Sequence, residues 1–208
     1  MTGVRLFART RRWGLNLGVM LAAAVLVAAC ASTAIGISAD GAKILVAMAI
    51  PVVPAISIAA SLSSSLAGQE RLAARNIARW DVIHAVSLTC ALLVVLGLSA
   101  LSLPSADDVA QNQAGISLWR NAIALTGASL IGYRALGPRM GWAVAVIWVV
   151  LPPQMVSRPW TDPVGLFTLT TQPDASANAL AWAIMIWVAG VASLTVPTRG
   201  LADAVRVP

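Results

Sequence analysis

The chain has 208 residues, of which 59% are hydrophobic and only 11% are charged, and its mean hydropathy is +0.82. Soluble domains carry about 25% charged residues, so this composition predicts an all-α, polytopic membrane protein. Every polar interval is shorter than the roughly 50 residues that a separate domain needs. The composition therefore excludes a soluble catalytic domain and predicts a single transmembrane domain over residues 1–208.

The first residues, 1–12, are basic and partly amphipathic. Several arginines share one face of a helical wheel, and the aromatic side chains lie away from that face. Such a segment can lie at the membrane interface with its arginines toward anionic head groups. A basic tail that only sets the topology is an equal alternative. The predicted interface residues are Arg5, Phe7, Arg9, Arg12 and Trp13.

Six apolar spans are predicted, most of them close to the roughly 20 residues that a membrane-crossing helix needs. They lie at residues 13–37, 42–66, 82–103, 118–136, 141–156 and 177–196. In the first, Gly14 and Gly18 have the GxxxG spacing that lets helices approach closely. In the second, Pro51 and Pro54 predict a kink with two flex points. In the fourth, Arg120 is expected to reach the outer interface, and the fifth is so short that its helix is expected to begin earlier.

The start of the chain also resembles a signal peptide, with a basic region, an apolar region and a lipoprotein-like box at residues 27–30. The apolar run continues past Cys30 and further spans follow, which favours a retained first helix. Cys30 and Cys90 both lie inside apolar spans, so neither a disulfide framework nor a thiolate metal site is predicted.

The basic residues set the orientation, because lysine and arginine concentrate on the cytoplasmic side of membrane proteins. With the N-terminus inside, eleven basic residues face the cytoplasm and three face outward. The cytoplasmic set is Arg5, Arg9, Arg11, Arg12, Arg71, Arg75, Arg79, Arg134, Arg139, Arg199 and Arg206, and the outer set is Lys43, Arg120 and Arg158. Membrane topology therefore explains the net charge of +6, and both termini are predicted on the cytoplasmic side.

The sequence predicts no catalytic residue and no metal site. His84 lies one turn from Asp81 at the entrance of a span, where the pair is expected to hydrogen-bond rather than to catalyse. No carboxylate pair lies within a predicted span, which disfavours a proton-coupled pump. The P-loop signature is missing, so this chain is not expected to bind a nucleotide by that route, and no cofactor is expected in it.

The predicted cytoplasmic connection, residues 67–81, is the longest charged interval with apolar spans on both sides. Arg71, Arg75 and Arg79 recur every four residues and would form one ridge on a helix. Such a helix would present a docking surface to a soluble partner, and a loop that only sets the topology is the alternative. The predicted partner-binding residues are Gln69, Glu70, Arg71, Leu72, Arg75, Ile77 and Arg79.

Several features together resemble the permease subunit of a bacterial type-2 ABC exporter. They are the six spans, the cytoplasmic termini, the basic N-terminal segment, the Gln69-Glu70-Arg71 sequence after the second span, and a semi-apolar outer segment at residues 157–176. The resemblance implies an interfacial elbow helix at residues 1–12, coupling to an ATPase at residues 68–79 and a re-entrant helical unit at residues 159–172. It also implies a second permease subunit, identical or related, and a separate ABC ATPase subunit that would hold ATP and Mg²⁺.

The sequence therefore predicts a transport subunit, not an enzyme, in the bacterial cytoplasmic membrane, with the lipid bilayer and no nucleic acid among its partners. An alternative from another class is a non-transporting accessory or immunity subunit of a larger membrane complex. A membrane enzyme is the third reading, and the lack of a polar constellation at membrane depth counts against it.

Overall fold

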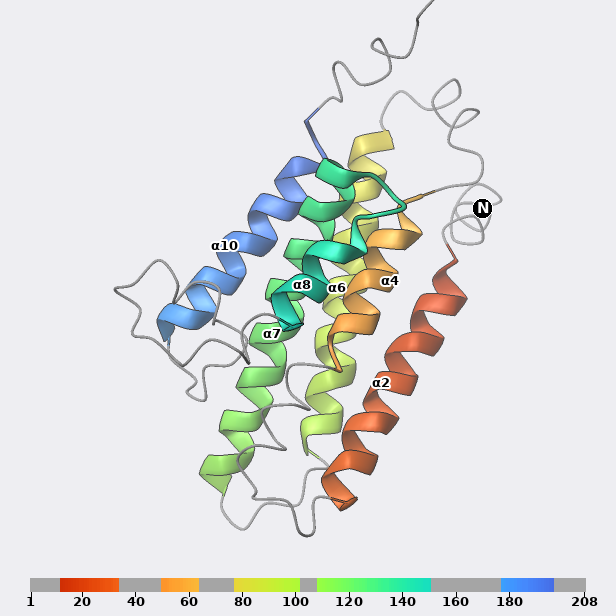
Figure 1. Ribbon diagram of the computed structural model, residues 1–208. Coiled ribbons are helices and arrows are strands. Elements are labelled where there is room, and N and C mark those ends of the chain that lie inside the picture. The colour runs from red at the N-terminus through yellow and green to blue at the C-terminus, as the bar shows by residue number, and fades with distance from the viewer. Residues whose placement is uncertain (1–11, 34–49, 64–76, 102–107, 151–176, 197–208) are drawn as a thin grey trace, which may run out of the picture.

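The computed structural model describes residues 12–33, 50–63, 77–101, 108–150 and 177–196. Within these ranges all regular structure is helical, and no strand is present. The helices of the described residues are α2 (Trp13–Thr33), α4 (Val52–Ser61), α6 (Ile77–Leu101), α7 (Asp108–Leu136), α8 (Trp142–Val150) and α10 (Ala177–Ser193). They lie side by side in one bundle (Figure 1). The all-α prediction is confirmed for this part of the chain.

Each predicted span contains one of these helices, but several of the boundaries differ. Helix α6 begins at Ile77, so the end of the predicted connection is already helical, and α7 begins at Asp108 rather than near residue 118. Helix α8 begins only at Trp142, after a turn in which Gly137 has φ 81°. Glycine adopts this left-handed conformation without the steric cost that a side chain adds. The prediction that the fifth helix begins before residue 141 is therefore wrong.

One helix of the described residues is long and apolar enough to cross a membrane. Its apolar part, Ala78–Leu101, has 24 residues. At 1.5 Å per residue this is about 36 Å, more than the roughly 30 Å of a bilayer's hydrocarbon core. Three other apolar stretches are shorter within the described ranges, at Trp13–Ala29, Val52–Ser61 and Asn178–Ser193.

Helix α7 is the centre of the bundle. It packs against α4, α6, α8 and α10, and nearly every residue from 117 to 130 is buried. The sequence marks this segment as the weakest span because it carries polar side chains. Since neighbouring helices surround α7, those side chains face protein, and a continuous apolar surface is not required of it.

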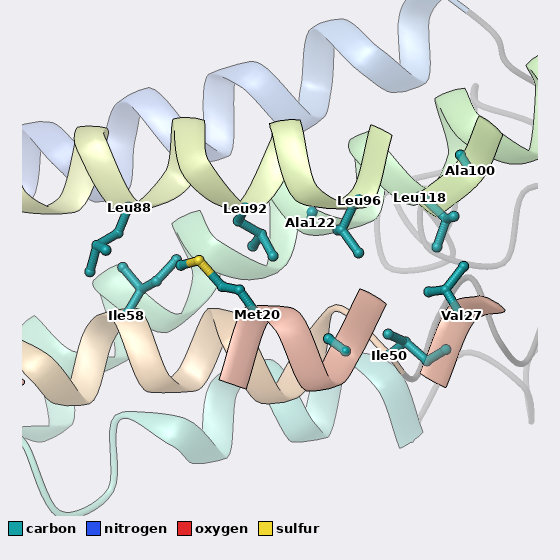
Figure 2. Close-up of a cluster of buried hydrophobic side chains, with 11 residues drawn as sticks. Met20, Val27, Ile50, Ile58, Leu88, Leu92, Leu96, Ala100, Leu118 and Ala122 are labelled. Atoms are coloured by element: carbon teal, nitrogen blue, oxygen red, sulfur yellow. The ribbon is translucent and has the colours of Figure 1, made fainter. Parts of the chain in front are cut away.

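A cluster of buried apolar side chains joins α6 to α2 and α4 (Figure 2). Leu88, Leu92 and Leu96 follow one another every four residues, so they lie on one face of α6. They point toward Met20 of α2 and Ile58 of α4 (Figure 2). The face of α6 that packs against the bundle is thereby fixed.

Helices α7 and α10 approach each other closely at Gly127 and Gly190. A Cβ atom on Gly190 would lie 2.6 Å from the carbonyl oxygen of Gly127. By contrast, Cβ atoms on Gly14 and Gly18 would meet nothing within 4 Å. Among the described residues, the GxxxG spacing in α2 is therefore not used for packing, whereas Gly127 and Gly190, which lie on two different helices, make a close contact.

Pro51 and Pro54 lie at the beginning of the described helix α4. Pro51 is the residue before the first turn, and its carbonyl accepts the backbone N–H of Ala55 at 3.1 Å. Pro54 is in the first turn, where backbone N–H groups have no acceptor within the helix. Neither proline breaks a hydrogen bond of α4. The part of the predicted span before residue 50 lies outside the described residues, so the kink and the flex-point role stay predictions.

The outward faces of the bundle are apolar, while several buried positions are polar. Leu15, Val25, Val94, Leu98 and Val188 are each more than half exposed. The buried polar and charged side chains are Asn16, Ser61, His84, Thr89, Ser99, Ser117, Arg120, Asn121, Thr126 and Ser129. Soluble proteins seldom expose large continuous apolar surfaces, so this distribution is the reverse of the one that water favours.

Candidate functional site

A buried polar cluster joins α2, α4 and α6 at the end of the bundle where α4 ends and α6 begins. We call it the α2–α4–α6 polar cluster. Its members are Trp13 and Asn16 of α2, Ser57 and Ser61 of α4, and His84 of α6. In apolar surroundings such side chains hydrogen-bond across helices, because an unpaired polar group there is costly.

His84 is the centre of the cluster and is completely buried. The indole Nε1–H of Trp13 donates to Nδ1 of His84 at 2.8 Å. The other ring nitrogen, Nε2, lies 2.8 Å from Oγ of Ser61. The Ser61 hydroxyl also lies 2.6 Å from the carbonyl oxygen of Ile58. One imidazole ring therefore connects three helices.

The hydrogen bonds that run from Trp13 through His84 and Ser61 to Ile58 allow only one arrangement of hydrogen atoms. An indole N–H is only a donor, so Nδ1 of His84 must be the acceptor and carry no proton. A neutral imidazole then has its proton on Nε2, which donates to Ser61 Oγ. Ser61 in turn donates its own hydrogen to the carbonyl of Ile58. Every donor and acceptor in this series of hydrogen bonds has a partner when His84 is neutral.

This arrangement also decides what the Ser61–His84 pair can do chemically. The distance would suit a serine nucleophile and a histidine base, but a general base must accept the serine proton. Here Nε2 carries the proton and donates to Ser61, so the ring cannot activate the hydroxyl. The pair is a helix-to-helix connection and not a nucleophile.

The ring nitrogens of His84 bond to Trp13 and Ser61, which lie on two other helices. The sequence suggests a bond between His84 and Asp81, its neighbour on α6. It gives no sign of the pairing with Trp13, because the two residues are 71 positions apart. The available signal is general: a lone histidine inside an apolar span needs partners on neighbouring helices.

Asn16 and Ser57 form the second connection of the cluster. Ser57 Oγ donates to Oδ1 of Asn16, and Nδ2 of Asn16 donates to the carbonyl oxygen of Arg12 at 3.3 Å. Asn16 is almost fully buried. It therefore ties α2 to α4 one turn from the Trp13–His84 bond.

Replacing Asn16 with alanine is expected to cost about 0.6–2 kcal/mol of folding stability, the range for interhelical hydrogen bonds in membrane proteins. The loss is limited because the Ser57 hydroxyl can turn to a carbonyl of its own helix. Unfolding with SDS in detergent micelles measures the difference. Asn178→Ala, the same exchange at an exposed position of α10, should be neutral, and an equal loss in both variants would contradict the assignment.

A second buried polar group lies in the central helix. Arg120 is only 1% exposed, and its Nε donates to Oδ1 of Asn121 at 3.2 Å. Asn121 is completely buried. The prediction that Arg120 reaches the outer interface is therefore wrong, because α7 begins at Asp108 and places Arg120 well inside the helix.

The predicted site residues are only partly within the described ranges. Arg12 is exposed and directly precedes α2, and Trp13 is partly buried against His84. Ile77 and Arg79 lie in the first turn of α6, where Arg79 is exposed. The predicted residues outside the described ranges are Arg5, Phe7, Arg9, Gln69, Glu70, Arg71, Leu72 and Arg75, together with the outer segment 157–176. The interface and coupling roles stay predictions.

Comparisons of the chain with protein-family models, with curated proteins and with solved structures give no significant match.

Proposed function

We propose that the chain is the membrane-spanning permease subunit of an ATP-driven type-2 ABC exporter in the bacterial inner membrane. The observation that carries the proposal is the basic, helix-prone connection at residues 67–81, placed between two apolar helices. Arg71, Arg75 and Arg79 on one ridge suit a soluble partner that pushes on the connection from the cytoplasm. The chain lacks a P-loop, so the ATPase is a separate subunit.

A six-span, multi-pass topology with both termini inside agrees with the distribution of side chains. Each predicted span contains a described helix, and α6 has the length and composition to cross a bilayer. Apolar residues cover the outward faces, whereas His84, Arg120 and Asn121 are inside the bundle. This is the pattern expected of helices that face lipid outside and protein inside.

The α2–α4–α6 polar cluster links the two helices on either side of the connection. Ser61 ends α4, and His84 lies in the second turn of α6, so the Ser61–His84 bond holds together the two helices that flank the connection. A push on residues 67–76 would then move α4 and α6 together. In an exporter, this movement would open a path between two permease subunits.

Co-purification tests the proposal. The tagged chain is purified from cells that also express its neighbouring genes, and any P-loop ATPase in the eluate is quantified. Association is expected for the wild type. Loss of Arg71, Arg75 and Arg79 to alanine should reduce it about tenfold or more, if each exposed ion pair contributes up to about 1 kcal/mol.

The matched control is the triple variant in which Arg139, Arg199 and Arg206 become alanine. It removes the same number of positive charges from the predicted cytoplasmic side. Association should be retained there. If no ATPase co-purifies with the wild type, the permease proposal fails and the accessory-subunit alternative gains. If both triple variants behave alike, the ridge only sets the topology.

A further inference from the structure

The hydrogen bond between Trp13 and His84 exists only in one protonation state of the ring. Histidine is the side chain that ordinarily changes charge between about pH 5 and pH 8. A second proton would sit on Nδ1, the nitrogen that accepts the indole N–H of Trp13 at 2.8 Å. Two N–H donors would then face each other, and the bond between α2 and α6 could not persist.

The bond on the opposite side of the ring survives the same change. Nε2 carries its proton in both the neutral and the charged ring, so it continues to donate to Ser61. Protonation therefore affects the contact with α2 and leaves the contact with α4. The two contacts respond differently because Trp13 and Ser61 bond to different ring nitrogens. General unfolding would instead break both contacts.

We propose that His84 is a proton-sensitive latch that holds the beginning of α2 against α6 when neutral and releases it when protonated. The latch does not depend on the exporter proposal, because it involves only described residues of this chain. A released α2 also gives the charged imidazole access to solvent or head groups, which lowers the cost of burying it.

Other charged and titratable side chains lie at the same end of the bundle as His84. Asp81 lies one turn away on α6 and is partly buried. The other charged or titratable groups of the described residues at this end are Arg12 of α2, Arg79 of α6, Tyr133 and Arg134 of α7, and Arg139 in the turn after α7. Helices α4 and α10 contribute none within their described ranges. Arginine, tyrosine and aspartate side chains ordinarily titrate outside the range from about pH 5 to pH 8, so the protonation of interest is that of the ring.

Distances between spin labels test the latch in the full chain. Cys90 is a native, exposed cysteine of α6 and carries one label. Leu15→Cys places a second label on the exposed face of α2, with Cys30→Ser removing the other thiol. Double electron–electron resonance in lipid nanodiscs is recorded at pH 8 and pH 5. The α2–α6 distance should lengthen or broaden at pH 5 by roughly 2 Å or more, the scale of helix shifts in switching proteins.

Two controls make the result specific. A label pair between Ala60→Cys, at an exposed position of α4, and Cys90 should keep its distance at both pH values. His84→Gln should abolish the pH response of the α2–α6 pair, because an amide can accept from Trp13 and donate to Ser61 but cannot gain a proton. Trp13→Phe should give the lengthened or broadened distance already at pH 8.

Three outcomes would overturn the latch. One is an α2–α6 distance in the wild-type background that is identical at pH 8 and pH 5. Another is an equal response in the α4–α6 pair, which would indicate loosening of the whole bundle. The third is a retained response in His84→Gln. If His84→Gln does not fold, the comparison of the α2–α6 distance at pH 8 and pH 5 in the wild-type background still tests the latch.

Discussion

Gly127→Ala and Gly190→Ala are each expected to destabilise the bundle by about 1–3 kcal/mol or more, the range for inserting atoms into a packed interior. A Cβ atom on Gly127 would lie 2.6 Å from the backbone N and Cα of Trp187. On Gly190 it would lie 2.6 Å from the carbonyl oxygen of Gly127. Backbone atoms cannot turn aside as a flexible side chain can, so α10 must move away from α7 along their whole contact.

The effect should be large because α7 is the central helix and its contact with α10 is extensive. Ala124 of α7 packs there against Ala179 and Ala183 of α10, and all three are buried. Small side chains let the two backbones approach, which strengthens van der Waals packing between the two helices. A single methyl group at the crossing weakens all of these contacts together.

Gly14→Ala and Gly18→Ala are the matched controls, since the same methyl group would meet nothing within 4 Å. Alanine is a better helix former than glycine by about 1 kcal/mol, so these variants should be neutral or slightly more stable. SDS unfolding in detergent micelles and the yield of monodisperse protein measure both pairs. Equal effects at the two sites would contradict the close approach of α7 and α10.

The second large effect is expected for Leu92→Ala, at about 2–5 kcal/mol. Leu92 is 0% exposed and lies in the cluster of buried apolar side chains that joins α6 to α2 and α4 (Figure 2). Removing most of its side chain leaves a cavity that rigid neighbouring helices fill only in part, and contacts with Met20 and Ile58 are lost. The same unfolding titration gives the value.

Leu98→Ala on the same helix provides the comparison, because Leu98 is 64% exposed. Its side chain faces outward, so its loss should change stability by less than about 0.5 kcal/mol. The comparison of Leu92→Ala with Leu98→Ala therefore shows which face of α6 is turned toward the bundle. Similar losses for Leu92 and Leu98, or a larger loss for Leu98, would show that α6 presents a different face to the bundle.

The existence and order of the helices were predictable from sequence, because long apolar runs separated by charges, prolines and glycines leave few alternatives to helices. The boundaries were less predictable. The beginning of α7 at Asp108 was missed because its first turns carry Asp108, Gln111, Asn112 and Gln113. Such residues read as an external loop when hydropathy is the guide, although glutamine is compatible with a helix.

The faces of the helices were not predictable from the sequence. Helix α6 is apolar on nearly every side, so periodicity does not distinguish Leu92 from Leu98. Glycine spacing pointed to Gly14 and Gly18, whereas the close approach uses Gly127 and Gly190, which lie on two different helices. A motif within one helix cannot indicate which partner helix it meets.

The sequence by itself determined that the described residues are helical, and it showed the apolar runs and the basic interval at residues 67–81, since these follow from composition and local order along the chain. Only the tertiary structure decided that α7 is central and that Arg120 is buried. It also decided that Trp13 and Ser61 bond to opposite nitrogens of His84. The physical reason is that polar groups among apolar helices are satisfied by whichever helix packs beside them, and that choice depends on packing across distant parts of the chain.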